Sequence, residues 1–117
     1  MFSREAGVAG LTALAKVGLS FDLLVRPRHL KFVPPLLERI PDLRVVIDHL
    51  GMPDVRSGVL EPWATDLAEI SRHPHSYCKI SGLVTESDWE NWTAEGLVPF
   101  VQKAVQLFGP GRLIFGS

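Results

Sequence analysis

Three features are scarce in this 117-residue sequence, and each absence excludes a class of protein. Cys78 is its only cysteine, so an internal disulfide is impossible and a reducing, cytoplasmic setting is expected. The 12 basic and 13 acidic residues form no block of either sign, which argues against a nucleic-acid or anionic-membrane partner. No apolar run reaches the roughly 18 residues that span a bilayer, and the N-terminus shows no signal-peptide pattern. We therefore expect a small-molecule or protein partner.

The sequence is rich in apolar runs that alternate with amphipathic segments. Hydrophobic residues make up 46% of the chain, which is enough to fill one core. The apolar runs predict four strands: 19–25, 44–50, 76–82 and 112–117. The segments between them, and one before the first strand, have helical spacing, although Pro34 and Pro35 restrict the second helix to a start near residue 34. Strands that alternate with helices need crossover connections, so we predict an α/β fold with a parallel sheet.

The segment Val45-Val46-Ile47-Asp48-His49-Leu50-Gly51 is the most informative in the chain. Its β-branched run predicts a strand covered on both faces, so the polar groups at its end are unlike ordinary surface residues. An imidazole suits either coordination of a divalent metal or general acid/base chemistry, because its pKa lies near neutrality. His49 is therefore a candidate catalytic or metal-binding residue, and a buried core histidine is the alternative.

Five ordered blocks carry a resemblance to a known family: 21–27, 46–51, 78–83, 85–89 and 113–117. With these blocks the sequence resembles the amidohydrolase-related family of TIM-barrel hydrolases, and within it the sugar-lactone and dicarboxylate lactonases. The resemblance implies a partial (β/α)8 barrel, with residues 1–117 as an incomplete single domain covering roughly the second half. It also implies that the active site lies at the C-terminal ends of the strands, where His49 is expected.

The same resemblance implies a hydrolase that opens a lactone or related acyl compound, with His49 assisting the attack of water. In the family this histidine acts with a His-x-His pair on the first strand and an aspartate after Phe-Gly-Ser, where this chain stops. The chain is therefore expected to be a piece of something larger and inactive alone. One divalent metal, zinc or similar, is implied for the intact enzyme, or none.

Two alternatives stay open at this point. One is a truncated, non-catalytic form that associates with itself or with another barrel half. The other is an open α/β domain that binds a small ligand, although no Gly-x-Gly-x-x-Gly follows any strand.

Charged residues near the predicted strand ends are candidates for substrate binding. Arg26 could hold a substrate carboxylate in two-point contact or could cap its loop, and Arg28 is a weaker candidate of the same kind. Lys79 and Ser81 share one face of their strand, which suits substrate orientation or a buried ion pair. Asp22 shares a face with Arg26, so a salt bridge and a site role are both open.

Three further groups are given structural interpretations. Asp48 should be a hydrogen-bonding partner rather than a catalyst, and Cys78 a structural thiol. His73-Pro74-His75 has the spacing of a metal pair but should lie at the opposite end of the barrel from the chemistry. Trp89 and Trp92, with the neighbouring acidic residues Glu86 and Asp88, could line a sugar-sized pocket, although apolar anchoring of the loop is the simpler explanation.

Overall fold

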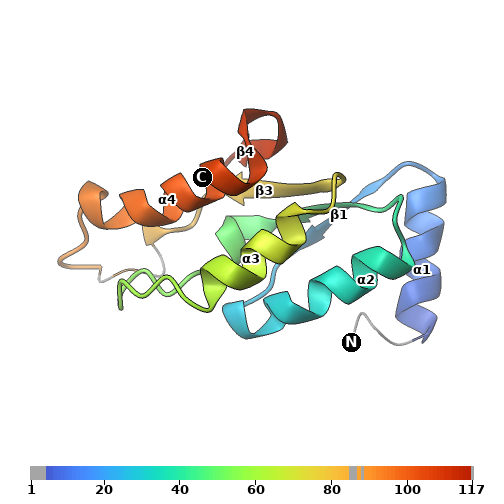
Figure 1. The fold of residues 1–117 in the computed structure, drawn as a ribbon, viewed down its shortest axis with the longest axis horizontal. Helices are drawn as coiled ribbons and strands as arrows, with labels where there is room; N and C mark the ends of the chain where they lie inside the picture. The colour runs from blue at the N-terminus through green and yellow to red at the C-terminus, as the bar shows by residue number, and fades with distance from the viewer. Residues whose placement is uncertain (1–4, 85–86, 88, 117) are drawn as a thin grey trace.

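A computed structural model describes residues 5–84, 87 and 89–116 of the chain (Figure 1). Its regular elements, in chain order, are α1 Glu5–Lys16, β1 Ser20–Leu23, a 3₁₀ turn Pro27–Phe32, α2 Val33–Arg39, β2 Arg44–Ile47, α3 Trp63–Ser71, β3 Ser76–Ile80, α4 Ala94–Phe108 and β4 Leu113–Phe115. The strands form one sheet in the order β1-β2-β3-β4, and every neighbouring pair is parallel. The predicted α/β class is confirmed, and the architecture is that of a partial barrel.

All four strands are shorter than predicted, and at β2 and β3 the polar residues that follow them leave the sheet. β2 ends at Ile47 rather than at residue 50, and β3 ends at Ile80 rather than at residue 82. β4 begins only at Leu113, after a 3₁₀ turn that contains Arg112. The late start of the second helix is confirmed, since α2 begins at Val33 with the two prolines in its first turn.

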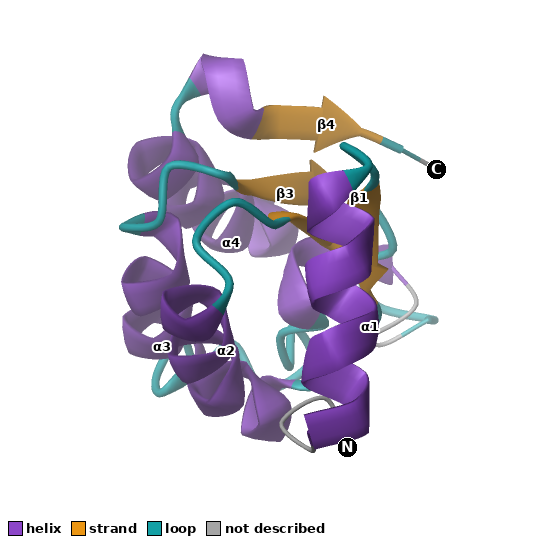
Figure 2. Cartoon of the chain, turned by 90° about the vertical axis from the view of Figure 1, so that its right-hand side faces the viewer, coloured by secondary structure: helices purple, strands orange, loops and turns teal. Residues whose placement is uncertain are grey.

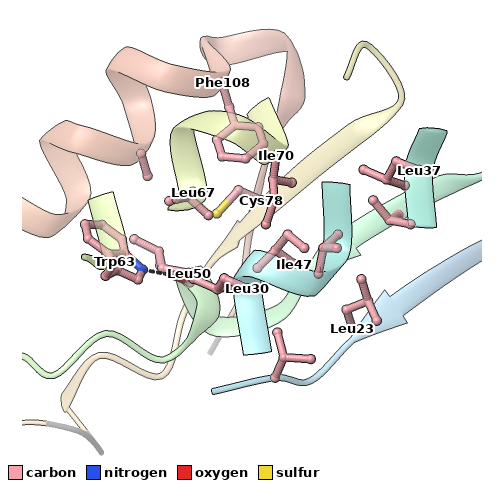
Figure 3. Packing of buried hydrophobic residues seen from close by; sticks show 14 of the residues in the cluster. Leu23, Leu30, Leu37, Ile47, Leu50, Trp63, Leu67, Ile70, Cys78 and Phe108 are labelled. Carbon is pink, nitrogen blue, oxygen red and sulfur yellow. Dashed lines mark hydrogen bonds between the residues drawn. The ribbon is translucent and has the colours of Figure 1, made fainter. Parts of the chain in front are cut away.

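Helices α2, α3 and α4 cover one side of the sheet, as Figure 2 shows. The buried core lies between these helices and the sheet (Figure 3). On the strands, the fully buried side chains that face this layer include Leu23, Val45, Ile47 and Cys78. Because strand side chains alternate, Asp22, Lys79 and Ile114 face the other side of the sheet. In a closed barrel this side would be the interior.

The helices begin and end at residues that suit their positions. The Thr93 side chain caps α4 by accepting a hydrogen bond from the Gly96 N–H at 3.1 Å, and the helix ends before Gly109, whose φ is +73°. α1 is tied to α2 by an ion pair of 3.0 Å between Glu5 and Arg39. Among the described residues, no helix is long and apolar enough to cross a membrane.

Candidate functional site

The C-terminal edge of the sheet, formed by residues 48–52 after β2 and 81–82 after β3, brings two predicted site residues together. A hydrogen bond of 2.6 Å joins Nδ1 of His49 to Oγ of Ser81. Both side chains are at least partly buried, which removes competing water from the contact. The sequence placed both residues in strands, but the structure places them just beyond the strand ends, where loops can aim side chains toward a substrate.

The backbone around His49 is left-handed for four consecutive residues. The φ angles of His49, Leu50, Gly51 and Met52 are +53°, +55°, +74° and +53°. For a residue with a Cβ, this conformation costs roughly 1–2 kcal/mol. The prediction of a strand through residue 50 was therefore wrong, since the chain turns sharply after Ile47 and only the glycine adopts the turn without strain. Strain of this kind concentrates at functional sites.

Gly82 packs directly against the imidazole. Its φ is +67°, and a Cβ at this position would lie 2.8 Å from both Cγ and Nδ1 of His49. Only a glycine therefore permits the contact between the two strand ends. Sequence reasoning did not single out Gly82, although a glycine directly after a strand is a signal for close backbone approach.

Trp63, at the start of α3, reaches the same turn from the helix layer. Its indole Nε1–H donates a hydrogen bond of 2.6 Å to the carbonyl oxygen of Leu50, drawn as the dashed line in Figure 3. Sequence reasoning gave Trp63 no role beyond the helical spacing of its segment. Nothing in the spacing of the sequence indicates this bond, because it joins a helix to a left-handed turn that was itself missed.

Lys79 lies between the carboxylates of Asp48 and Asp22. Its Nζ is 3.2 Å from Oδ1 of Asp48 and 3.5 Å from Oδ2 of Asp22, and its side chain is 27% exposed. The bond to Asp48, followed by the charge of Asp48 and then of Asp22, raises the pKa of Lys79. The ion-pair alternative for Lys79 is thus present, and it links three neighbouring strands.

Asp48 forms an ion pair with Lys79, and its structural role stays a prediction. Its Oδ1 atom is buried and has the Lys79 ammonium as its ionic partner, but within the described residues it receives no well-oriented hydrogen bond. Asp22 is half exposed and also pairs with Lys79. The alternative salt bridge between Asp22 and Arg26 stays a prediction.

The other candidates lie in the segments that follow β1 and β3. Arg26 and Arg28 are exposed at the turn after β1, where the Arg26 backbone N–H donates to Nδ1 of His29. Trp89 and Trp92 are exposed, and Trp92 borders a shallow hollow together with Val55 and Leu97. Glu86 and Asp88 lie outside the described residues.

His73 and His75, which have the spacing of a metal pair, lie at the opposite end of the sheet from His49, as predicted. His73 and His75 fall in the connection from α3 to β3, and their backbone carbonyls accept hydrogen bonds from the N–H groups of Ser76 and Val45. Cys78 is buried as a free thiol, and burial raises its pKa to about 12, which fits the structural role expected for it.

The described residues do not by themselves form a metal centre. No three His, Cys, Asp or Glu side chains among them gather in a way that could hold an ion. His49 contacts a serine hydroxyl, and the two nearby aspartates are directed at Lys79. A metal at His49 would need further ligands from outside this set, so His49 as a metal ligand stays a prediction.

Comparison with known proteins identifies the family. The Amidohydrolase family model matches residues 3–117. The chain is 39% identical over 107 residues to an L-fucono-1,5-lactonase of Burkholderia ambifaria, covering 92% of this chain and 37% of that protein. An L-fucono-1,5-lactonase of Burkholderia multivorans is 37% identical over 120 residues, with 95% and 40% covered. The chain thus spans about two fifths of the length of the curated relatives it matches.

Solved structures agree with this match. A Burkholderia multivorans amidohydrolase crystallised with bound zinc superimposes with a TM-score of 0.89 at 34% identity, covering 97% of this chain and 42% of that one. A putative 2-pyrone-4,6-dicarboxylic acid hydrolase of Pseudomonas putida gives 0.68 at 26% identity, with 92% and 39% covered. By sequence and by fold, the chain belongs to the amidohydrolase family, and the lactonase branch fits.

Proposed function

We propose that residues 1–117 are part of one barrel domain and supply part of the active site of a hydrolase that opens a lactone or related acyl compound. The observation that carries the proposal is the 2.6 Å bond between His49 and Ser81, which lie after neighbouring parallel strands. In (β/α)8 enzymes, catalytic residues come from several strand ends on this same face. The lactonase relatives supply the class of substrate.

His49 would act as the general base. If its Nδ1–H donates to Ser81 Oγ, the Nε2 lone pair is free to accept a proton from water as the water oxygen attacks the lactone carbonyl. The ring ester bond then breaks, and the imidazolium returns its proton to the departing alkoxide. The imidazole is thereby neutral again, and the product is the open hydroxy acid.

Three side chains are proposed to hold the substrate. The Ser81 hydroxyl, while accepting from His49, retains its own proton for a substrate oxygen. The Lys79 ammonium forms ion pairs with Asp22 and Asp48, and its side chain is still partly exposed, so one of its N–H groups could also orient a polar group of the substrate. Arg26, on the turn after β1, would hold a carboxylate where the substrate carries one.

Association without catalysis is the second candidate, and it has a specific observation in its favour. Large apolar side chains are exposed on both edge strands or beside them: Leu24, at 65%, next to β1, and Phe115, at 88%, on β4. Open sheet edges with exposed apolar groups favour pairing with another barrel half or a second copy. Analytical ultracentrifugation of the purified chain decides this, since a monomer across the accessible concentration range would reject it.

A hybrid barrel tests the hydrolase proposal. In the Burkholderia ambifaria lactonase, the matching 107-residue segment is replaced by this chain, and hydrolysis of a sugar-lactone panel is followed with a pH indicator. We expect the hybrid to be active and the isolated chain to show no turnover. His49→Ala should lower kcat by about a hundredfold or more, because a general base contributes that much.

His75→Ala is the matched control in the same hybrid. His75 is exposed at the other end of the sheet, so its removal should leave kcat within a factor of about two. Circular dichroism establishes first that the three hybrids are folded. Equal activity of His49→Ala and the unaltered hybrid would reject His49 as the base, and turnover by the isolated chain above its own His49→Ala variant would reject the expected inactivity.

A further inference from the structure

We propose that Trp63 is a positioning residue for His49. Its indole holds the left-handed turn after β2 in place, and the turn directs the imidazole toward Ser81. The structural part of this inference concerns the chain alone. Its consequence for turnover rests on the proposed function, so the two are tested separately.

The left-handed turn needs an external restraint. His49 has φ +53° and ψ +41°, and Leu50 has φ +55° and ψ +21°, although neither is a glycine. Two adjacent residues in this region are disfavoured, and they persist only where surrounding contacts determine the conformation. Relaxation of either residue to the ordinary helical or extended region would swing the His49 side chain away from Ser81.

The bond from Trp63 is suited to provide this restraint. It is buried, its length is 2.6 Å, and it ends on the carbonyl of Leu50, inside the strained segment. If the turn relaxed, that carbonyl would move and a buried indole N–H would lose its partner. A buried donor without a partner is unfavourable, so the bond opposes relaxation of the turn.

Trp63 is itself held rigidly. Its side chain is 2% exposed, it lies in the first turn of α3, and its ring packs against Phe100 of α4 with centroids 5.5 Å apart. The restraint on the turn therefore comes from two packed helices, which hold a site more firmly than a loop could. On the far side the imidazole packs closely against Gly82, where an added Cβ would lie 2.8 Å from the ring.

Trp63→Phe tests the inference, because it removes the N–H donor and keeps a ring in the core. The readout is the pair of ring-nitrogen NMR signals of His49 in the isotope-labelled 117-residue chain. We expect one tautomer in the unaltered chain, and a shift toward averaged signals in Trp63→Phe. Trp92→Phe, at an exposed position, should leave them unchanged.

Phe108→Leu controls for general destabilisation. Phe108 is buried at the end of α4, and its replacement leaves both the indole donor of Trp63 and the ring contact with Phe100 in place, so the His49 signals should stay as they are. Equal shifts in Phe108→Leu and Trp63→Phe would overturn the inference, as would no shift in Trp63→Phe.

If Trp63→Phe does not fold, hydrogen exchange of the indole N–H groups in the unaltered chain provides a second test. The indole N–H of Trp63 should exchange at least about a hundredfold more slowly than that of Trp92. Equal rates would overturn the inference.

In an active hybrid barrel, Trp63→Phe should lower kcat about tenfold while KM changes less than about twofold, since misplacement of a catalytic group acts on kcat. An unchanged kcat would overturn the inference, whereas a hybrid with no activity at all would count against the proposed function and leave the NMR result to decide this one.

Discussion

The two edges of this sheet are built from the same four strands but differ in how their polar groups are treated. At the N-terminal edge, formed by residues 18–19, 71–76 and 109–112, the polar groups satisfy one another. Nη1 of Arg112 donates to the carbonyl oxygens of Ser71, His73 and Ser76 at 2.9, 3.0 and 3.3 Å. Arg44 likewise donates to the carbonyl of Gly18. This edge joins strands to helices, and these hydrogen-bonding groups are used within the chain rather than for a ligand.

The C-terminal edge holds the opposite features. Its turn is left-handed at His49 and Leu50, and the Asp48 oxygen is buried without a well-oriented hydrogen bond from any described residue. Strain and incomplete satisfaction are tolerated where a site requires them. Under the proposed function, the chain would use one edge for stability and the other for function, as barrel enzymes do.

Arg112→Ala should give the largest effect and should be confined to stability. It removes a donor from the carbonyls of Ser71, His73 and Ser76, of which that of His73 keeps its bonds from Ser76, and it removes the guanidinium from the face of Phe108. We expect these losses to lower the free energy of unfolding by about 3 kcal/mol. Urea unfolding followed by circular dichroism measures this. Arg72→Ala is the matched control, since Arg72 forms an exposed ion pair with Glu69 worth at most about 1 kcal/mol. If the two variants lost equal stability, the N-terminal edge would not have the structural role assigned to it.

Gly82→Ala should disturb the C-terminal edge. The new Cβ would lie 2.8 Å from the imidazole, so the ring must move and the bond to Ser81 should be lost. Gly58→Ala is the control, because Gly58 has a similar φ of +72° but no atom within 4 Å of the added Cβ. We expect Gly82→Ala to be less stable than this control by about 1–3 kcal/mol, the usual cost of overpacking. If Gly82→Ala and Gly58→Ala lost equal stability in urea unfolding, backbone strain alone would explain the effect at Gly82.

Cys78 probes the core between the two edges. Burial raises its pKa from 9.0 to about 12, so the unfolded chain releases the thiol proton before the folded chain does. The associated stability is complete below pH 9 and falls as the pH rises from 9 toward 12, by about 1.4 kcal/mol per unit. Urea unfolding at pH 8 and pH 10 should therefore show about 1.4 kcal/mol more loss in the unaltered chain than in Cys78→Ala. The same loss in both would show that this thiol is not desolvated.

The sequence was sufficient for the architecture of the chain. Apolar runs and helical spacing located all four strands and the helices, because tertiary packing here follows the local preferences. The sequence also brought out His49 and Ser81, since each follows an apolar strand and a sheet of parallel strands gathers such ends at one edge. Their contact follows from the parallel topology of the sheet, and the alternation of strands and helices along the sequence already predicts that topology.

The missed features depend on contacts between distant segments. The left-handed turn at 49–52 follows a β-branched run without any local signal, and Trp63 and Gly82 contact it from distant parts of the chain. The role of Arg112 depends on carbonyls about 40 residues earlier in the chain. Interactions of this kind leave no periodic signal in a single sequence.

Two serines at the opposite ends of β3 test the central claim most directly. Ser76 donates at the N-terminal edge to the carbonyls of Ile70 and His73 at 2.8 and 2.7 Å, and Ser81 contacts His49 at the C-terminal edge. In the hybrid barrel, we predict that Ser81→Ala lowers kcat about tenfold with little change in the melting temperature. Ser76→Ala should lower the melting temperature and leave kcat within a factor of about two. If Ser81→Ala left kcat unchanged, or if Ser76→Ala lowered it equally, the division of function and stability between the two edges would be contradicted.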